Sequence, residues 1–507
     1  MLRLLGLTLC VLSLLQVPPL VRARPDFGIN LAITGSGKVS QSATDANEVV
    51  QALDDNTAFT ADTSYPGLQE LADQLAGVAD MTVQLGGELV PLVTALVADM
   101  SGNVAGAFGP VFAKITAIKT TIATDLPTAN AAIDAIVGHY VPDQLTDGFE
   151  RIVEGLQDLE ELLGTLKAAI DAAVGQAGSA DSVTPALVKK YVKPALVYRV
   201  VFAVNQLKAY VPVVKYTIDS TLENINLADD YLLIVYEALN QSSATAAALQ
   251  AQISAVTEAI ATTVKTQLDG YEENFVATES GVADLTAVAA APDYAAVTNA
   301  LEAFGVHFDS LSSTLYPALD GYLLALLEVL ATALPGSGTS GNVSSDLLDS
   351  LILTLIENGK FAQFCFYKYY GLVLGFLTSI ADNASLCFDK EERRLTFLKD
   401  SLPGIMALLP FDYDAILDQL STCDWLTDPD TLSECLTTLA GFHTAIAVEF
   451  GHKLQYVFDL IGAETEASAN RFLICLELTK LNLVEISEPT LLDEIRQCAL
   501  GGPTADD

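Results

Sequence analysis

Cysteine is the residue type in this chain whose number and spacing most clearly predict a chemistry. The chain holds seven cysteines, and all but Cys10 lie between residues 365 and 498. These six are Cys365, Cys387, Cys423, Cys435, Cys475 and Cys498. An even number of cysteines in a secreted chain predicts disulfides, and none of the six has the Cys-x-x-Cys spacing of a metal or redox site. Structural disulfides are therefore favoured.

The pairing that we expect joins neighbours in the sequence, because a turn signal separates the members of each pair. The expected bridges are Cys365–Cys387, Cys423–Cys435 and Cys475–Cys498. Each of them would hold two consecutive helices together. By loop entropy alone, the short loop between Cys423 and Cys435 would contribute about 3 kcal/mol.

The first residues have the pattern of a secretory signal peptide. Arg3 precedes the apolar run 4–15, two prolines follow, and Val21-Arg22-Ala23 offers small residues for cleavage. We expect residues 1–23 to be removed together with Cys10, which makes the protein extracellular. Asn-x-Ser sequons begin at Asn240, Asn342 and Asn383, and we expect these asparagines on exposed turns if they are glycosylated.

The charge balance excludes several classes of partner. With 64 acidic against 25 basic residues, the formal net charge is -39, so nucleic acid and anionic membranes are disfavoured. Hydrophobic residues nevertheless make up 51% of the chain, which must bury them in helix contacts, in self-association or around an apolar ligand. No run of 18 uncharged apolar residues follows the leader, which predicts no transmembrane segment.

One stretch departs from this acidity and is the candidate partner patch. No Asp or Glu occurs between Asp181 and Asp219. The cations there are Lys189, Lys190, Lys193, Arg199, Lys208 and Lys215, and tyrosine and phenylalanine alternate with them. This pattern fits a docking surface for an anionic head group, a sulfated polysaccharide or an acidic partner. The competing interpretation is that the cations face the chain's own carboxylates, with Tyr191, Tyr198 and Phe202 in the core.

Other polar groups favour structural roles. Glu150, Glu154, Asp158 and Glu161 follow one another at helical spacing, as solvated helix faces do. His443 and His452 would lie on opposite sides of one helix, where they cannot share a metal ion. Asp428-Pro429-Asp430 lacks the glycine and later ligands of a calcium loop and indicates a turn and cap, while Thr431 and Glu434 fit a capping box. No nucleophile elbow, zinc-protease pair or phosphate loop occurs, so we expect no enzyme, cofactor or metal.

The elements that carry these residues are predicted to be long helices. Leucine and valine recur in steps of three and four over residues 68–96, 149–173, 249–275 and 301–322. Glycine and proline predict a kink or a break near Gly86-Gly87 and Pro91 and turns at 102–110 and 125–127, while residues 186–216 are helical in spacing but contain Pro194 and Pro212. The cysteine-bearing part is expected to form helices over 345–381, 390–409, 413–422, 431–461, 464–483 and 490–499. Residues 27–33 could form a strand.

We therefore predict an all-α fold with long antiparallel helix bundles or a stacked helical rod, and with a disulfide-stabilised helical C-terminal module. The expected organisation is a signal peptide (1–23), a poorly periodic segment (24–65), a cysteine-free bundle region (66–334), a Gly/Ser linker (335–345), a disulfide-stabilised helical domain (346–500) and an acidic tail (501–507).

The function that these features favour is that of a secreted, acidic, helical binding or interaction protein without catalytic activity. Its expected partner is an extracellular protein or a small apolar ligand. The alternative is a structural component of an extracellular secretion or matrix that self-associates through its helix seams. Neither alternative involves nucleic acid.

Overall fold

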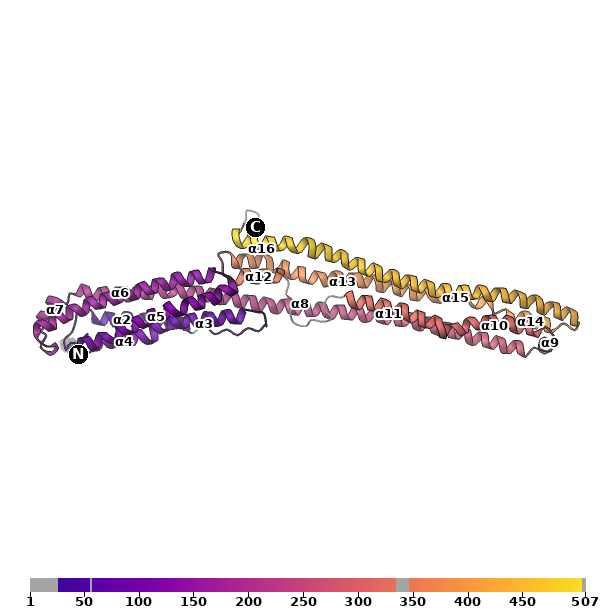
Figure 1. The fold of residues 1–507 in the computed structure, drawn as a ribbon, viewed down its shortest axis with the longest axis horizontal. Helices are drawn as coiled ribbons and strands as arrows, with labels where there is room; N and C mark the ends of the chain where they lie inside the picture. Colours follow the sequence, from indigo (N-terminus) through magenta and orange to yellow (C-terminus); the bar gives the residue numbers. More distant parts are fainter. Residues whose placement is uncertain (1–25, 55–56, 334–345, 504–507) are drawn as a thin grey trace, which may run out of the picture. The chain divides into compact units, whose positions relative to one another are not determined.

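The computed structural model describes residues 26–54, 57–333 and 346–503, and within these ranges every regular element is a helix (Figure 1). An isolated bridge between Asp26 and Ile29 stands where a strand was expected. The all-α fold class predicted from the sequence is confirmed. The expected signal peptide with Cys10, the expected linker 335–345 with Asn342, and residues 504–507 of the expected acidic tail lie outside the described residues.

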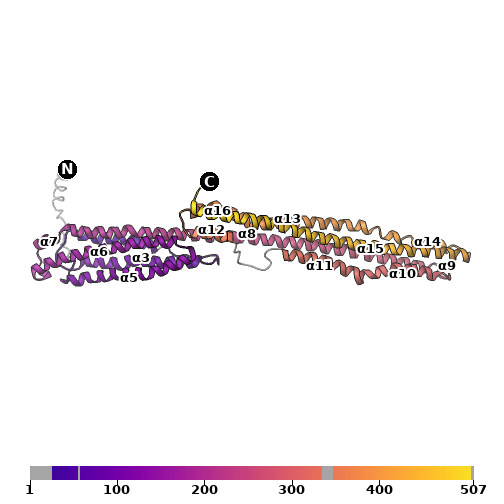
Figure 2. The same ribbon diagram turned by 45° about the horizontal axis from the view of Figure 1, so that its top comes forward.

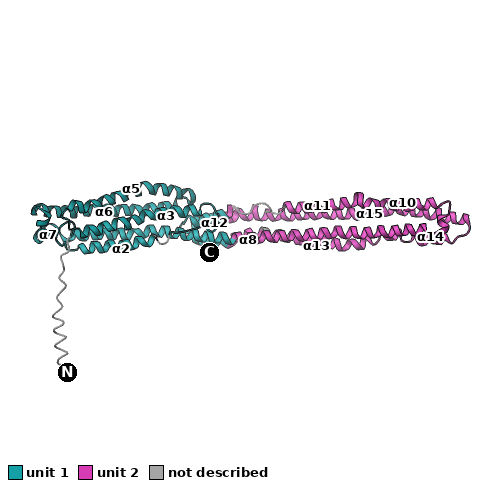
Figure 3. Ribbon diagram, turned by 90° about the horizontal axis from the view of Figure 1, so that it is seen from below, with its two compact units in different colours: residues 1–234, 348–370, 494–507 teal, residues 235–347, 371–493 magenta. Residues whose placement is uncertain are grey.

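The chain divides into two compact units, coloured separately in Figure 3. Unit 1 comprises residues 1–234, 348–370 and 494–507, and unit 2 comprises residues 235–347 and 371–493. Each unit thus combines cysteine-free sequence with sequence that carries cysteines. The domain ranges proposed from the sequence stay predictions.

Unit 1 contains a set of helices that pack lengthwise. Its elements, in chain order, are α2 (Ser36–Asp54), α3 (Leu68–Gln84), a π-helical turn (Leu85–Leu89), α4 (Val90–Ala98), α5 (Val104–Val137), α6 (Tyr140–Ala177), a 3-10 turn (Ala180–Ser182), α7 (Pro185–Tyr191), α8 (Pro194–Ala283) up to residue 234, α12 (Asp346–Ile356) from residue 348, the first turns of α13 (Ala362–Met406) and the end of α16 (Glu488–Gly501). Helices α5 and α6 form an antiparallel hairpin, visible in Figures 1 and 2.

The leucine seam explains this packing. Leu68, Leu71 and Leu75 are fully buried, as their three-four spacing predicts. Two glycines let helices approach closely. A Cβ atom at Gly86 would lie 3.1 Å from the Val50 side chain of α2, and one at Gly155 would lie 2.8 Å from the Leu207 side chain of α8. The small residues are therefore needed for close packing.

Unit 2 is built around α15. Its elements, in chain order, are the rest of α8, α9 (Thr286–Ala289), α10 (Tyr294–Ser310), a π-helical turn (Leu311–Leu315), α11 (Tyr316–Ala333), α13 from residue 371, a 3-10 turn (Pro410–Asp412), α14 (Ile416–Asp424), α15 (Pro429–Lys480), a π-helical segment (Leu481–Ser487) and the start of α16. Helix α15 lies along α10 and α11 (Figure 2). Phe308 packs against both Phe275 and Phe450, with ring centroids 5.2 and 5.1 Å apart, so aromatic contacts form part of the core.

Several predicted helix breaks are wrong. Helix α5 runs through Pro110 and Pro127, and α8 runs through Pro212. Helix α15 covers two predicted helices without a break. At Gly86-Gly87, where a kink or a break was expected, the structure has a π-helical turn in a continuing helix. The reason is that buried apolar residues lie on both sides of each proline of α5, so packing outweighs the lost hydrogen bond.

The three disulfides are present, but two of the predicted pairings are wrong. Cys423–Cys435 is confirmed, whereas the other bridges are Cys365–Cys498 in unit 1 and Cys387–Cys475 in unit 2. Cys365 and Cys387 cannot pair because both lie on α13, about 33 Å apart at 1.5 Å per residue. Each long-range bridge instead ties α13 to another helix, and their Cα atoms lie 5.8 and 6.0 Å apart.

The conclusion that no segment could cross a membrane is also wrong. Among the described residues, the helical stretches 68–98, 294–332 and 362–424 are long and apolar enough to do so, by length and composition. A helix that spans a membrane need not be free of charges, since it tolerates an isolated charge such as Glu328. Only 44%, 28% and 38% of the apolar windows in these stretches is buried inside the protein, so more than half of each window lies outside the core.

Candidate functional site

The candidate partner patch lies on α7 and the first turns of α8 in unit 1. Thr184 and Lys193 each precede a proline that begins a helix, namely Pro185 of α7 and Pro194 of α8. Proline suits the first helical position because its fixed φ is already helical and its missing N–H has no partner there. The helical structure is therefore interrupted between α7 and α8, and the cations of both helices lie near this interruption.

The six cations do not share one environment. Lys215 pairs with Asp219 at 2.6 Å, one turn away on α8, and Lys208 lies 3.9 Å from Asp45 of α2. The other four are exposed and form no ion pair with any residue that the structure describes. These four are Lys189, Lys190, Lys193 and Arg199. The interpretation that the cations face the chain's own carboxylates therefore holds for Lys208 and Lys215 only.

Two aromatic side chains expected in the core lie on the surface instead. Tyr198 is 52% exposed and Phe202 is 63% exposed. Neither residue belongs to the buried face of α8, which Val197, Val200 and Val204 form. This valine stripe is visible in the sequence and would have placed the two rings correctly. Tyr191 is partly buried, and the Lys190 ammonium lies 4.8 Å from its ring centre.

We define the basic–aromatic surface by six residues: Lys189, Lys190, Lys193, Tyr198, Arg199 and Phe202. Its cations attract carboxylate, sulfate or phosphate groups, and its rings offer apolar contact next to them. It contains no cysteine, histidine or carboxylate to act as nucleophile, base or metal ligand. The arrangement suits binding.

A cavity in unit 1 bears on the expected apolar ligand. Apolar residues of α2, α4, α6 and α8 line it, among them Val50, Val93, Leu159 and Leu207. Its volume is about 40 Å³. Pockets that enclose small ligands typically measure about 300–1,000 Å³, so this cavity is too small for such a ligand and is a packing defect.

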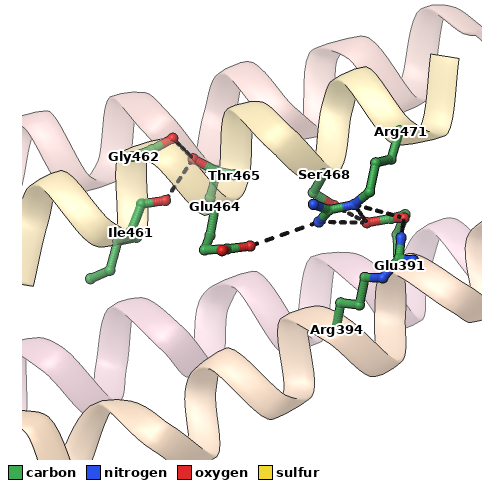
Figure 4. A network of polar contacts seen from close by, with 8 residues as sticks. All are labelled: Glu391, Arg394, Ile461, Gly462, Glu464, Thr465, Ser468 and Arg471. Carbon is green, nitrogen blue, oxygen red and sulfur yellow. Dashed lines mark hydrogen bonds and ion pairs between the residues drawn. The ribbon is translucent and has the colours of Figure 1, made fainter. Parts of the chain in front are cut away.

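A buried carboxylate in unit 2 was not singled out from the sequence. Figure 4 shows Glu391 of α13 among Arg394, Ser468 and Arg471. Arg394 forms a short ion pair with it, while the Ser468 hydroxyl donates at 2.9 Å and the Arg471 guanidinium at 3.1 Å. Glu391 lies one turn from Cys387, and Arg471 one turn from Cys475. The cluster and this disulfide hold α13 to α15 at adjacent turns, so its role is structural.

The remaining sequence candidates are dispersed. His443 is buried, with Nε2 3.1 Å from Gln419 Oε1, whereas His452 is exposed, so the two do not share a site. Glu150, Glu154, Asp158 and Glu161 are all exposed on α6. Among the described residues, no group of three or more His, Cys, Asp or Glu side chains is placed to hold a metal ion.

The start of α15 and the location of two sequons differ from what the sequence predicted. Asp428 caps α15, since its carboxylate accepts a hydrogen bond from the Thr431 backbone N–H at 3.0 Å. The helix therefore starts three residues before the capping box that we expected at Thr431. Asn240 and Asn383 lie inside α8 and α13, so the expectation that they stand on turns is wrong.

Trp425 was assigned no role from the sequence. It is the only tryptophan and is 87% exposed in the turn between α14 and α15. A large aromatic ring in water is unfavourable, so a single tryptophan placed in a turn is a sequence signal of a contact residue.

Comparisons with protein-family models, with curated proteins and with solved structures found no match to this chain.

Proposed function

We propose that this chain is a secreted, non-catalytic helical interaction protein that binds an acidic protein partner through its basic–aromatic surface. The observation that carries the proposal is a set of four exposed cations that form no ion pair with any described residue, in a chain whose net charge is -39. Cations in so acidic a chain are expected to pair internally. Four that do not pair leave positive charge available to another molecule.

The exposed rings favour a protein over a polyanion. Protein interfaces combine an apolar or aromatic centre with charged groups at the rim, and Tyr198 and Phe202 beside Arg199 offer both. An extended polyanion or an anionic membrane would also have to lie against carboxylates elsewhere on the surface, which repel it. The cavity of about 40 Å³ among α2, α4, α6 and α8 is itself too small to enclose an apolar ligand.

Secretion is part of the proposal. The leader pattern of residues 1–23 and the three disulfides support it, because disulfides persist in oxidising compartments. Analysis of the medium and the cell lysate after expression with the native leader tests this step. Retention of the chain inside the cell, with free thiols, would contradict it.

The docking function can be tested with two synthetic probes, polyglutamate and a copolymer of glutamate and tyrosine. We expect the copolymer to bind more tightly, because it supplies apolar contact as well as charge. Lys190→Glu with Lys193→Glu should abolish binding of both probes. Tyr198→Ala with Phe202→Ala should remove the preference for the copolymer and leave polyglutamate binding almost unchanged.

Two controls sharpen this test. Arg496→Glu changes an exposed cation elsewhere in unit 1 and should leave binding unchanged. Circular dichroism of each variant reports whether the helices persist. Equal binding by the wild type and by the Lys190→Glu, Lys193→Glu variant would refute the proposed site. Tighter binding of heparin or of anionic vesicles than of the copolymer would refute the assignment to a protein partner.

A further inference from the structure

The turn between α14 and α15 in unit 2 presents a rigid, acidic and aromatic surface. The Cys423–Cys435 disulfide joins the two helices on either side of it. The Asp424 carboxylate accepts hydrogen bonds from the backbone N–H groups of Ala287 and Val288 at 2.6 and 2.9 Å, which fixes the turn against α9. The turn is thus held in place although Trp425 lies in solvent.

Three carboxylates follow this tryptophan within nine residues of the sequence. Asp428, Asp430 and Glu434 are exposed and form no ion pair with any described residue. The hydrogen bonds from Thr431 lower the pKa of Asp428, so this carboxyl group is ionised at neutral pH. We call Trp425, Asp428, Asp430 and Glu434 the acidic tip.

Charge of a single sign extends well beyond the tip. No Lys or Arg occurs between Lys399 and Lys453, whereas no Asp or Glu occurs between Asp181 and Asp219. One chain therefore carries a stretch with cations only and a stretch with carboxylates only. The two surfaces complement each other in a second way, since tryptophan is the ring that binds lysine and arginine most strongly.

A hollow beside the tip adds an apolar contact. Leu426 and Leu439 contribute to its lining, together with Thr431 and Glu434, and its volume is about 520 Å³. The rings of Tyr198 and Phe202 are exposed residues of the kind that such a hollow accepts. An aromatic side chain that entered it would bring neighbouring cations close to Glu434.

We propose that the acidic tip of one copy of this chain is the partner that binds the basic–aromatic surface of a second copy. This inference rests on the proposed function and names the partner of the same site. The contact joins two different surfaces, so the first copy keeps a free basic–aromatic surface and the second keeps a free acidic tip. Such heterologous contacts continue from copy to copy until a ring closes or a filament grows.

The test measures self-association of the full mature chain by sedimentation at increasing protein concentration, at low and at high salt. We expect association at low salt and its loss at high salt, because salt screens the ion pairs. The fluorescence of Trp425, the only tryptophan, should shift to shorter wavelength on association as water leaves the ring. Trp425→Ala should weaken association at least tenfold, as loss of a central aromatic contact does.

Charge reversal identifies the two surfaces. Lys190→Glu with Lys193→Glu cancels the net charge of one surface, and Asp430→Lys with Glu434→Lys makes the other positive while leaving the cap residue Asp428 in place. Each variant alone should stay monomeric. A mixture of the two should associate, because the unaltered acidic tip of the first variant then meets the unaltered basic–aromatic surface of the second. Glu150→Lys with Glu154→Lys on α6 is the matched acidic control and should associate like the wild type.

The outcomes separate this inference from the proposed function. A wild type that stays monomeric at every concentration, yet binds the acidic probes through the basic–aromatic surface, would refute the second copy as partner and leave the function standing. Failure of both self-association and probe binding would refute both. Association that survives each reversal, or that the α6 control abolishes, would show that other surfaces join the copies and would overturn the inference.

Discussion

Units 1 and 2 use the same principle of helix packing but differ in the charge that they expose. Both bury seams of leucine, valine and isoleucine between long helices. Helices α7 and α8 of unit 1 expose four cations that form no ion pair with a described residue, whereas unit 2 exposes Trp425 and, a few residues further along the chain, three carboxylates. These residues lie outside the shared packing pattern, so that pattern alone does not explain where they lie.

The units differ also in how their helices are cross-linked. Unit 1 holds the Cys365–Cys498 bridge, while unit 2 holds Cys387–Cys475, Cys423–Cys435 and the buried cluster around Glu391. Unit 2 therefore relies more on covalent and ionic links between helices.

Removal of a long-range disulfide should have the largest effect. Cys365→Ser with Cys498→Ser in unit 1, or Cys387→Ser with Cys475→Ser in unit 2, should each lower the unfolding free energy by about 4–5 kcal/mol, because each bridge closes a long loop. Removal of Cys423–Cys435, which closes a loop of 12 residues, should cost about 3 kcal/mol. Denaturant unfolding measures these differences, and peptide mapping without reduction checks the pairings. Peptides that join Cys365 to Cys387 would contradict the structure.

Loss of the buried carboxylate in unit 2 should come next. Glu391→Gln leaves Arg471 and Arg394 without their shared anion and should cost about 2 kcal/mol. The control is Asp389→Asn, which removes the exposed ion pair with Arg393 and should cost less than about 0.5 kcal/mol. Equal effects of the two substitutions in thermal unfolding would mean that burial of Glu391 does not matter.

Removal of an exposed ring of the basic–aromatic surface should hardly change stability. Phe202→Ser should change the unfolding free energy by no more than about 0.5 kcal/mol, because the ring does not contribute to the core. Leu207→Ala, on the buried face of the same helix, should cost about 2–3 kcal/mol and serves as the reference. A large destabilisation by Phe202→Ser would show that the ring packs against the protein, and the basic–aromatic surface would lose its apolar part.

The pH dependence of unit 2 should show the smallest effect. Burial, reinforced by nearby carboxylates such as Asp309, raises the pKa of Glu272 and of Glu279 above the ordinary value of 4.5. Both groups therefore hold a proton more tightly in the folded chain. The loss of folding stability that their ionisation causes is absent below pH 4.5 and grows as the pH rises through the raised pKa.

Glu272→Gln with Glu279→Gln should thus stabilise the protein at pH 7 by a few tenths of a kcal/mol and should have no effect below pH 4.5. Unfolding curves at both pH values measure this difference. His443 shifts stability in the opposite sense, because burial lowers its pKa and stability falls as the pH drops below 6.5. Both proteins carry His443, so its effect cancels in the comparison. A variant that is less stable at pH 7 would contradict the sign.

Local patterns were sufficient to predict much of the fold. The seam that begins at Leu68 and the one through Phe149 and Ile152 were predicted from spacing alone, and their residues are buried as expected. Local signals failed where they met long-range packing. Pro110 and Pro127 stop an isolated helix, but in α5 the apolar contacts on both sides keep the helix continuous.

The candidate site was predicted in part. Its cations followed from the missing carboxylates between Asp181 and Asp219, a fact of composition. Whether those cations were free depended on which carboxylates fold next to them, as Asp45 does near Lys208. That proximity joins residues far apart in the chain, so single-sequence reasoning could not supply it.

Periodicity, charge and cysteine spacing are properties of local sequence and composition, so they were sufficient to predict a helical, acidic chain in which six of the seven cysteines are spaced for disulfides. The pairing of Cys365 with Cys498, the exposure of Phe202 and Trp425, and the burial of Glu391 among arginines became visible only in the folded chain. Pairing and burial depend on which helices lie side by side. That arrangement is set by the free energy of the whole packed chain.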